Sequence, residues 1–98
     1  MANRKIIWTP KSIKTRILLY DYWDNRNKSK SYSQKLHFLF KSALKIVATF
    51  PKLAISTNNK DVRLKLVRDY QIVYLATDTQ IIVLDIWDTR QNPENFPL

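Results

Sequence analysis

The hydrophobic stripe between residues 31 and 50 constrains the fold of this chain more than any other feature of its sequence. Its apolar residues recur at spacings of three and four, the period of one face of an α-helix. Ser31 or Ser33 is a suitable N-cap, and the proline at position 51 disfavours a helical residue before it. The pattern predicts a helix of about 18 residues that must bury one face against another layer. The stripe comprises Leu36, Leu39, Phe40, Ala43, Val47 and Phe50.

The first third of the chain predicts a short strand and an earlier helix. Residues 4–8 are rich in apolar and β-forming side chains and are predicted to form the strand. Thr9 is a good N-cap, and Pro10 fits the first helical turn, where its missing N–H costs nothing. Residues 25–30 are polar and are predicted to form the loop between the two helices.

Three further strands are predicted after a polar loop. Residues 62–67 alternate in polarity, with Val62, Leu64 and Leu66 expected on the core face. Residues 70–76 and 81–87 are rich in β-forming side chains, and the last of these strands is hydrophobic enough to be central.

This order of elements predicts an α+β fold of the type β-α-α-β-β-β. A helical hairpin would pack on one face of a mainly antiparallel, four-stranded sheet. We expect one domain over residues 1–98, in which residues 89–98 form an irregular tail. The open face of the sheet would carry Arg63, Lys65, Gln71 and Asp88, and would be available for binding.

The charge of the chain predicts a polyanionic partner. Lys and Arg number 17 against eight Asp and Glu, for a net charge of +9. Residues 1–60 hold most of the positive charge, whereas residues 61–98 are slightly acidic. Such a bias favours nucleic acid, an acidic protein segment or an anionic membrane surface. A merely solubilising surface is the alternative interpretation.

Several classes of site are not expected. The chain has no glycine, which excludes the glycine-built phosphate loops, and no cysteine, which excludes thiolate metal sites. His37 is the only histidine and is interpreted as a partly exposed helix residue. We therefore expect no metal, no cofactor and no small-molecule substrate. The N-terminus does not match a signal peptide and the apolar runs are too short to span a bilayer, so a cytoplasmic protein without a membrane partner is expected.

A cluster of cationic side chains is a better candidate for a functional site than a metal or cofactor site. If the last three strands pair in order, we expect the start of the first and the end of the third near one edge, so that Arg63 and Arg90 converge. Such cations could grip a phosphate and stabilise charge during phosphodiester cleavage. The candidate catalytic residues are Arg63, Lys65, Asp88 and Arg90, and the candidate nucleic-acid-binding residues are Arg68, Gln71 and Trp87.

Two segments, in this order of elements, resemble the RelE/ParE toxin superfamily. They are residues 62–74 (VRLKLVRDYQIVY) and 86–93 (IWDTRQNP), and Trp8-Thr9-Pro10 and Phe50-Pro51 also fit the pattern. The resemblance covers nearly the whole chain. It implies the toxin of a bacterial type II toxin–antitoxin system, with a role such as plasmid stabilisation. The implied partner is a cognate antitoxin that wraps the toxin with an acidic C-terminal segment.

The resemblance implies two different targets. RelE-type members are mRNA interferases that cleave mRNA on the ribosome, whereas ParE-type members inhibit DNA gyrase. Arg90 matches an arginine of the cleaving branch, but Gln71 and Phe96 stand where that branch has an arginine and a tyrosine. Asp88 is then the conjectured base.

Three hypotheses follow from these residues. The first is a ribosome-dependent mRNA endonuclease, whose enzymatic activity the two substituted positions leave uncertain. The second is a non-enzymatic gyrase inhibitor. The third is a general RNA- or DNA-binding module, which predicts binding to bare nucleic acid that depends steeply on salt.

Overall fold

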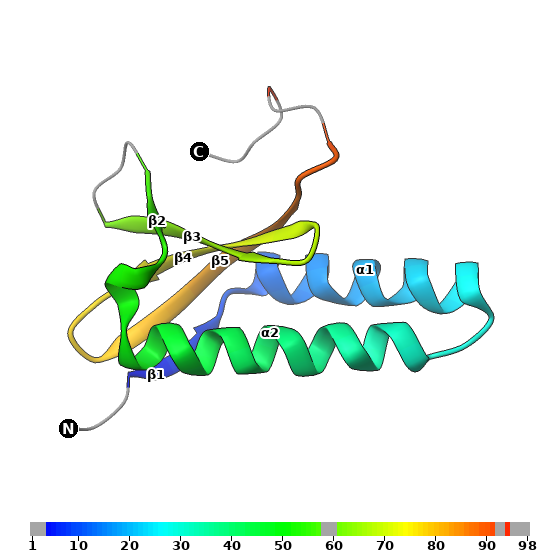
Figure 1. The fold of residues 1–98 in the computed structure, drawn as a ribbon, viewed down its shortest axis with the longest axis horizontal. Helices are drawn as coiled ribbons and strands as arrows, with labels where there is room; N and C mark the ends of the chain where they lie inside the picture. Colours follow the sequence, from blue (N-terminus) through cyan, green and yellow to red (C-terminus); the bar gives the residue numbers. More distant parts are fainter. Residues whose placement is uncertain (1–3, 58–60, 92–93, 95–98) are drawn as a thin grey trace.

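A computed structural model describes residues 4–57, 61–91 and 94. Two helices and a mixed five-stranded sheet follow one another in the order shown in Figure 1. Most of the predicted tail at residues 89–98, including Phe96, lies outside the described residues. The elements are β1 (Lys5–Trp8), α1 (Pro10–Asn27), α2 (Ser31–Thr49), the 3-10 helix η1 (Pro51–Leu53), β2 (Ile55–Ser56), β3 (Val62–Val67), β4 (Tyr70–Ala76) and β5 (Gln80–Asp88).

The predicted α+β class and the order of the main elements are confirmed. The strands lie in the order β1-β5-β4-β3-β2, with β1 parallel to β5 and the other pairs antiparallel. The sheet has five strands instead of four because the two-residue strand β2 pairs with the outer side of β3. Two residues are too few to produce an alternation in the sequence.

Thr9 joins the first strand to the first helix. Its hydroxyl oxygen accepts the backbone N–H of Ser12 at 3.2 Å, which confirms the predicted N-cap. The same hydroxyl donates to the carbonyl of Val83 at 2.9 Å, and the backbone N–H of Thr9 donates to that carbonyl at 3.1 Å. One residue therefore caps α1 and holds it to β5.

The chain makes its left-handed turns without glycine. Lys28 ends α1 with φ 52°, and Arg68 turns the β3–β4 hairpin with φ 57°. A non-glycine residue costs roughly 1 kcal/mol or more in this region, so both turns are maintained by the packed elements that flank them.

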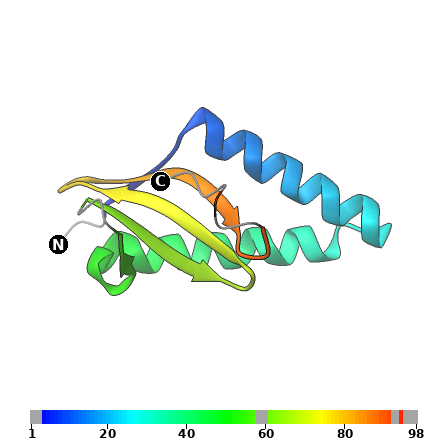
Figure 2. The same ribbon diagram turned by 90° about the horizontal axis from the view of Figure 1, so that it is seen from above.

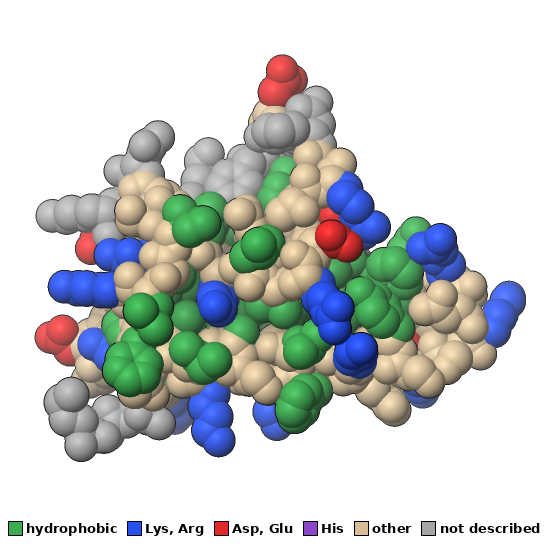
Figure 3. Space-filling model, in the orientation of Figure 1, with side chains coloured by type: hydrophobic (Ala, Val, Ile, Leu, Met, Phe, Trp, Pro, Cys, Tyr) green, Lys and Arg blue, Asp and Glu red, His purple; other side chains and the backbone are tan. Residues whose placement is uncertain are grey.

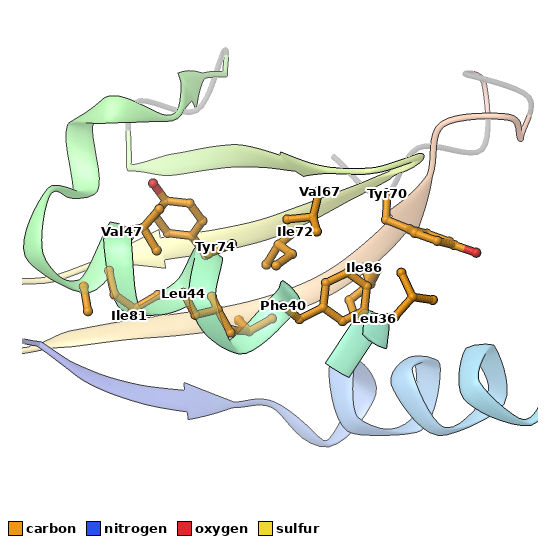
Figure 4. Close-up of a cluster of buried hydrophobic side chains, with 13 residues drawn as sticks. Leu36, Phe40, Leu44, Val47, Val67, Tyr70, Ile72, Tyr74, Ile81 and Ile86 are labelled. Atoms are coloured by element: carbon orange, nitrogen blue, oxygen red, sulfur yellow. The ribbon is translucent and has the colours of Figure 1, made fainter. Parts of the chain in front are cut away.

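The hydrophobic core lies between α2 and the central strands. The predicted stripe is buried at Leu36, Phe40, Ala43 and Val47, which confirms the helix. Phe50 is exposed at the C-cap of α2 and is not part of the core. Figure 4 shows the side chains of α2 packed against those of β4 and β5; the strand residues of the core are Val67, Tyr70, Ile72, Tyr74, Ile81, Val83 and Ile86.

The predicted faces of β3 are wrong. Residues directly opposite each other in an antiparallel pair share a face. Arg63 is opposite Tyr74 and Lys65 is opposite Ile72, and both of those partners are core residues. Arg63 and Lys65 therefore lie on the helix side of the sheet, and Leu64 and Leu66 lie on the other side. Long basic side chains tolerate this position because β3 lies near the sheet margin, where their charged ends reach polar groups.

None of the helices in the part of the chain described is long and apolar enough to cross a membrane.

We predict that Thr9→Ala lowers the free energy of unfolding by about 1–2 kcal/mol, because the substitution removes the N-cap of α1 and the hydroxyl bond to β5. Urea denaturation followed by circular dichroism measures the change. Ser42→Ala is a control, because the Ser42 hydroxyl bonds only within α2, to Phe38, and should change stability by less than about 0.5 kcal/mol. An equal loss in the two variants would contradict the linking role of Thr9.

Candidate functional site

A well-defined hollow lies where the end of β5 meets α1. Its volume is about 500 Å³. Figure 2 shows β5 (orange) ending beside α1 (blue to cyan). Leu18 and Tyr22 form an exposed apolar rim on α1, four residues apart on one helix face. We call this hollow the α1–β5 basin; its lining residues are Thr15, Leu18, Leu19, Tyr22, Tyr70, Ile86, Asp88, Arg90 and Gln91.

An ion pair between Asp88 and Arg90 lines the basin. The Arg90 guanidinium donates from Nε to Oδ1 at 3.0 Å and from Nη2 to Oδ2 at 2.9 Å. The backbone N–H of Arg90 also donates to Asp88 Oδ1, at 2.9 Å. These hydrogen bonds lower the pKa of the Asp88 carboxyl below its usual value and raise the pKa of Arg90. The carboxylate is therefore a weakened base, and the charge of the guanidinium is largely neutralised.

Tyr22 and Tyr70 are the aromatic residues among those that line the basin, and Trp23 lies beside Tyr70. The indole N–H of Trp23 donates to the hydroxyl of Tyr70 at 2.8 Å, and the Arg90 guanidinium lies 6.0 Å from the centre of the Trp23 ring. Burial raises the pKa of Tyr70, partly offset by the bond from Trp23. Of the residues at this site, Asp88 and Arg90 are among those predicted from the sequence, whereas Leu18, Tyr22, Trp23 and Tyr70 are not.

The four candidate catalytic residues do not converge, and the expected meeting of Arg63 with Arg90 is wrong. Arg63 is opposite Tyr74, which is opposite Val83, and Arg90 lies seven positions beyond Val83. At about 3.3 Å per residue this is a separation of roughly 20 Å. Three antiparallel strands in order bring the start of the first beside the start of the third, not beside its end.

Arg63 instead belongs to the opposite end of the sheet. Its Nη1 donates to the carbonyl of Ala54 at 3.0 Å. It also lines a smaller hollow of about 210 Å³ together with Arg4, Lys52, Asp61 and Asp78. Three cations, Arg63 included, and two acids line this hollow, so it has no concentrated positive charge.

The three candidate nucleic-acid-binding residues lie at one end of the sheet. Gln71 and Trp87 are directly opposite each other and share the face that carries Leu66. Arg68 is exposed in the adjoining hairpin. Gln71 is thus separated by the sheet from the Asp88–Arg90 pair, since Asp88 is opposite Tyr70 on the helix side.

His37 lies on the exposed side of α2, as expected. Its Nδ1 is 3.1 Å from the Tyr20 hydroxyl. Burial and the charges of Arg16 and Lys41 lower the pKa of His37, and burial raises that of Tyr20 to about 12. Within residues 4–57, 61–91 and 94, no group of three or more His, Asp or Glu side chains is placed to hold a metal ion.

Comparison with known proteins gives one family and one fold. The family model described as "ParE toxin of type II toxin-antitoxin system, parDE" matches residues 6–93. A solved structure described as "Chromosomal ParDE TA system from P. aeruginosa" superposes with a TM-score of 0.69 at 14% sequence identity, and the match covers 85% of this chain and 92% of that one. No curated protein matches the sequence.

We predict a pH-dependent contribution of the Asp88–Arg90 pair to stability. Because the pKa of Asp88 is lowered on folding, the pair stabilises the fold above the unfolded value of about 3.9, and the effect is lost as pH falls through the folded value. Asp88→Asn should cost at most about 1 kcal/mol at neutral pH, since Arg90 is half exposed.

Urea titrations at pH 7 and at about pH 3 measure this difference. The gap between Asp88→Asn and the original chain should narrow at the lower pH. Asp21→Asn removes the same charge from an exposed position on α1 and serves as the control. A gap that persists unchanged at low pH would contradict the ion-pair explanation.

Proposed function

The chain belongs to the ParE toxin family of type II toxin–antitoxin systems, and we propose that it acts by binding and inhibiting DNA gyrase without catalysing a reaction. As a type II toxin it has a cognate antitoxin as its partner. Gyrase is the target implied for ParE-type members by the resemblance of the sequence. Its action would then lie in the bacterial cytoplasm, where gyrase and its DNA are found.

The separation of the candidate catalytic residues is the observation that carries this proposal. Phosphodiester cleavage needs a base and charge-stabilising cations around one phosphate. Arg63 lies at the far end of the sheet from Asp88 and Arg90. Asp88 and Arg90 are bound to each other, which weakens the base and neutralises the cation. This geometry favours a binding surface over a catalytic centre.

The chemistry of the α1–β5 basin suits contact with a protein. Tyr and Arg are the residues that most often dominate protein–protein binding energies, particularly beside apolar contacts. Tyr22, Leu18 and Arg90 all line the basin, and the first two are exposed on α1. We therefore propose that gyrase contacts these three residues.

Ribosome-dependent cleavage of mRNA stays a prediction. It would have to rely on Asp88 and Arg90 without Arg63, after their ion pair had opened. Primer extension on transcripts from induced cells tests it directly, because cleavage within codons gives new ends. Intact transcripts during full growth arrest would count against the nuclease.

The experiment for the proposed function is a supercoiling assay with purified gyrase and relaxed plasmid. We expect the toxin to inhibit supercoiling, and the Tyr22→Ala and Arg90→Ala variants to require about tenfold more protein for the same inhibition, in the range of a binding hot spot. Lys14→Ala, an exposed basic residue of α1 outside the basin, is the matched control and should inhibit normally.

Two results would contradict the proposal. Supercoiling could proceed unchanged at toxin concentrations well above those of gyrase, in which case the target is wrong. Alternatively, gyrase could be inhibited equally by the original chain and both basin variants, in which case the basin is not the contact surface.

Induction in cells should also raise a DNA-damage response.

A further inference from the structure

A row of polar and basic side chains runs along the outer side of α2. Its members recur at spacings of three and four, which places them on one side of the helix, and each is exposed. The core stripe of α2 faces the sheet, so the row lies on a different side of the helix, toward solvent. Figure 3 shows Lys and Arg side chains (blue) along the lower side of the molecule, where α2 runs in Figure 1. We call this the α2 row; its residues are Lys30, Gln34, His37, Lys41 and Lys45.

The centre of the α2 row borders α1. The Tyr20 hydroxyl of α1 is 3.1 Å from Nδ1 of His37. The guanidinium of Arg16, one turn earlier on α1, lies 4.4 Å from the centre of the Trp8 ring. Burial and the positive charges of Arg16 and Lys41 lower the pKa of His37. Both charges that act on His37 are positive, so an anion beside it would be stabilised.

Little negative charge lies near the row in sequence. Residues 1–60 contain two acids, Asp21 and Asp24, and both are on α1. The Asp24 carboxylate accepts the hydroxyl of Ser33 in the first turn of α2. From residue 25 to residue 57 the chain has seven Lys or Arg and no Asp or Glu. The positive charge is therefore most concentrated in the second half of the row.

We propose that the α2 row binds the phosphate backbone of duplex DNA. Lys and Gln are among the side chains that contact phosphate oxygens without reading the base sequence. From Lys30 to Lys45 the row is about 22 Å long, at 1.5 Å per residue, which is enough to meet several phosphates of one duplex. The source of the DNA rests on the proposed function: the α1–β5 basin would contact gyrase, and the row would contact the duplex that gyrase holds.

Other anionic partners fit the row less well. The row contains no apolar side chain, and within α2 Phe38 is the large apolar residue exposed beside it. Protein interfaces depend on clusters of buried aromatic and apolar anchors, and a bilayer surface binds helices that insert an apolar face. A phosphate backbone requires only closely spaced cations and hydrogen-bond donors.

Binding of a short labelled DNA duplex, followed by fluorescence anisotropy over a range of salt concentrations, tests the proposal. We expect Lys41→Ala/Lys45→Ala to bind about tenfold more weakly at low salt. The slope of log K against log salt should fall by about two, since each phosphate contact contributes roughly 0.9. Lys14→Ala/Lys35→Ala removes the same charge from exposed positions outside the row and should bind almost normally. Equal losses in the two double variants would overturn the proposal, because binding would then follow net charge alone.

His37 provides a readout that needs no variant. It is the only histidine of the chain, so its imidazole signal in the NMR spectrum of the untagged toxin reports on the centre of the row. We expect saturating duplex to raise the pKa of His37, because phosphate oxygens would offset the charges of Arg16 and Lys41. The Tyr20 hydroxyl, whose pKa burial raises to about 12, stays neutral throughout. A His37 signal that titrates identically in the free and the bound toxin would overturn the proposal.

An RNA duplex of the same length distinguishes the two nucleic acids, and tighter binding to RNA than to DNA would overturn the assignment to DNA. None of these measurements contains gyrase. Binding of DNA through the row without inhibition of supercoiling would refute the proposed target alone. Inhibition of supercoiling by a toxin that has no affinity for the duplex would refute the role of the row alone.

Discussion

Packing of α2 against β4 and β5 is the interaction on which the rest of the structure depends. Leu36, Phe40, Leu44 and Val47 are almost completely buried there. Each contributes about 1.5–3 kcal/mol by leaving water, so together they are comparable with the whole net stability of a small domain. In β4, Tyr70, Ile72 and Tyr74 must therefore face α2. The register of β4 with its neighbours then determines which side chains of those strands face α2.

The position of β3 follows from this constraint. Its register against β4 places Val67, Lys65 and Arg63 on the inner side, whatever their polarity. The inner side at the margin of the sheet is only partly covered, so Arg63 can bond the carbonyl of Ala54. The consequence is that Leu66 faces away from the helices and is 54% exposed.

The sequence predicted the fold well because its strongest signals were local. The stripe of α2, the Thr9-Pro10 cap and the hydrophobic run of β5 depend on neighbours a few residues away. The faces of β3 and the meeting of Arg63 with Arg90 depend on pairing between distant residues. The sequence of an alternating strand determines which side chains share a face, but the pairing with its partner strand determines which face is buried. For β3, hydrophobicity alone predicted the wrong face.

The two ends of the sheet use their charges differently. At the end of β5, Asp88 and Arg90 form a bidentate pair, so the α1–β5 basin presents aromatic and apolar surface with little net charge. Around α2, the cations have no acids near them in sequence, and the charge remains available to a partner. The net charge of +9 therefore describes one side of the molecule better than the other.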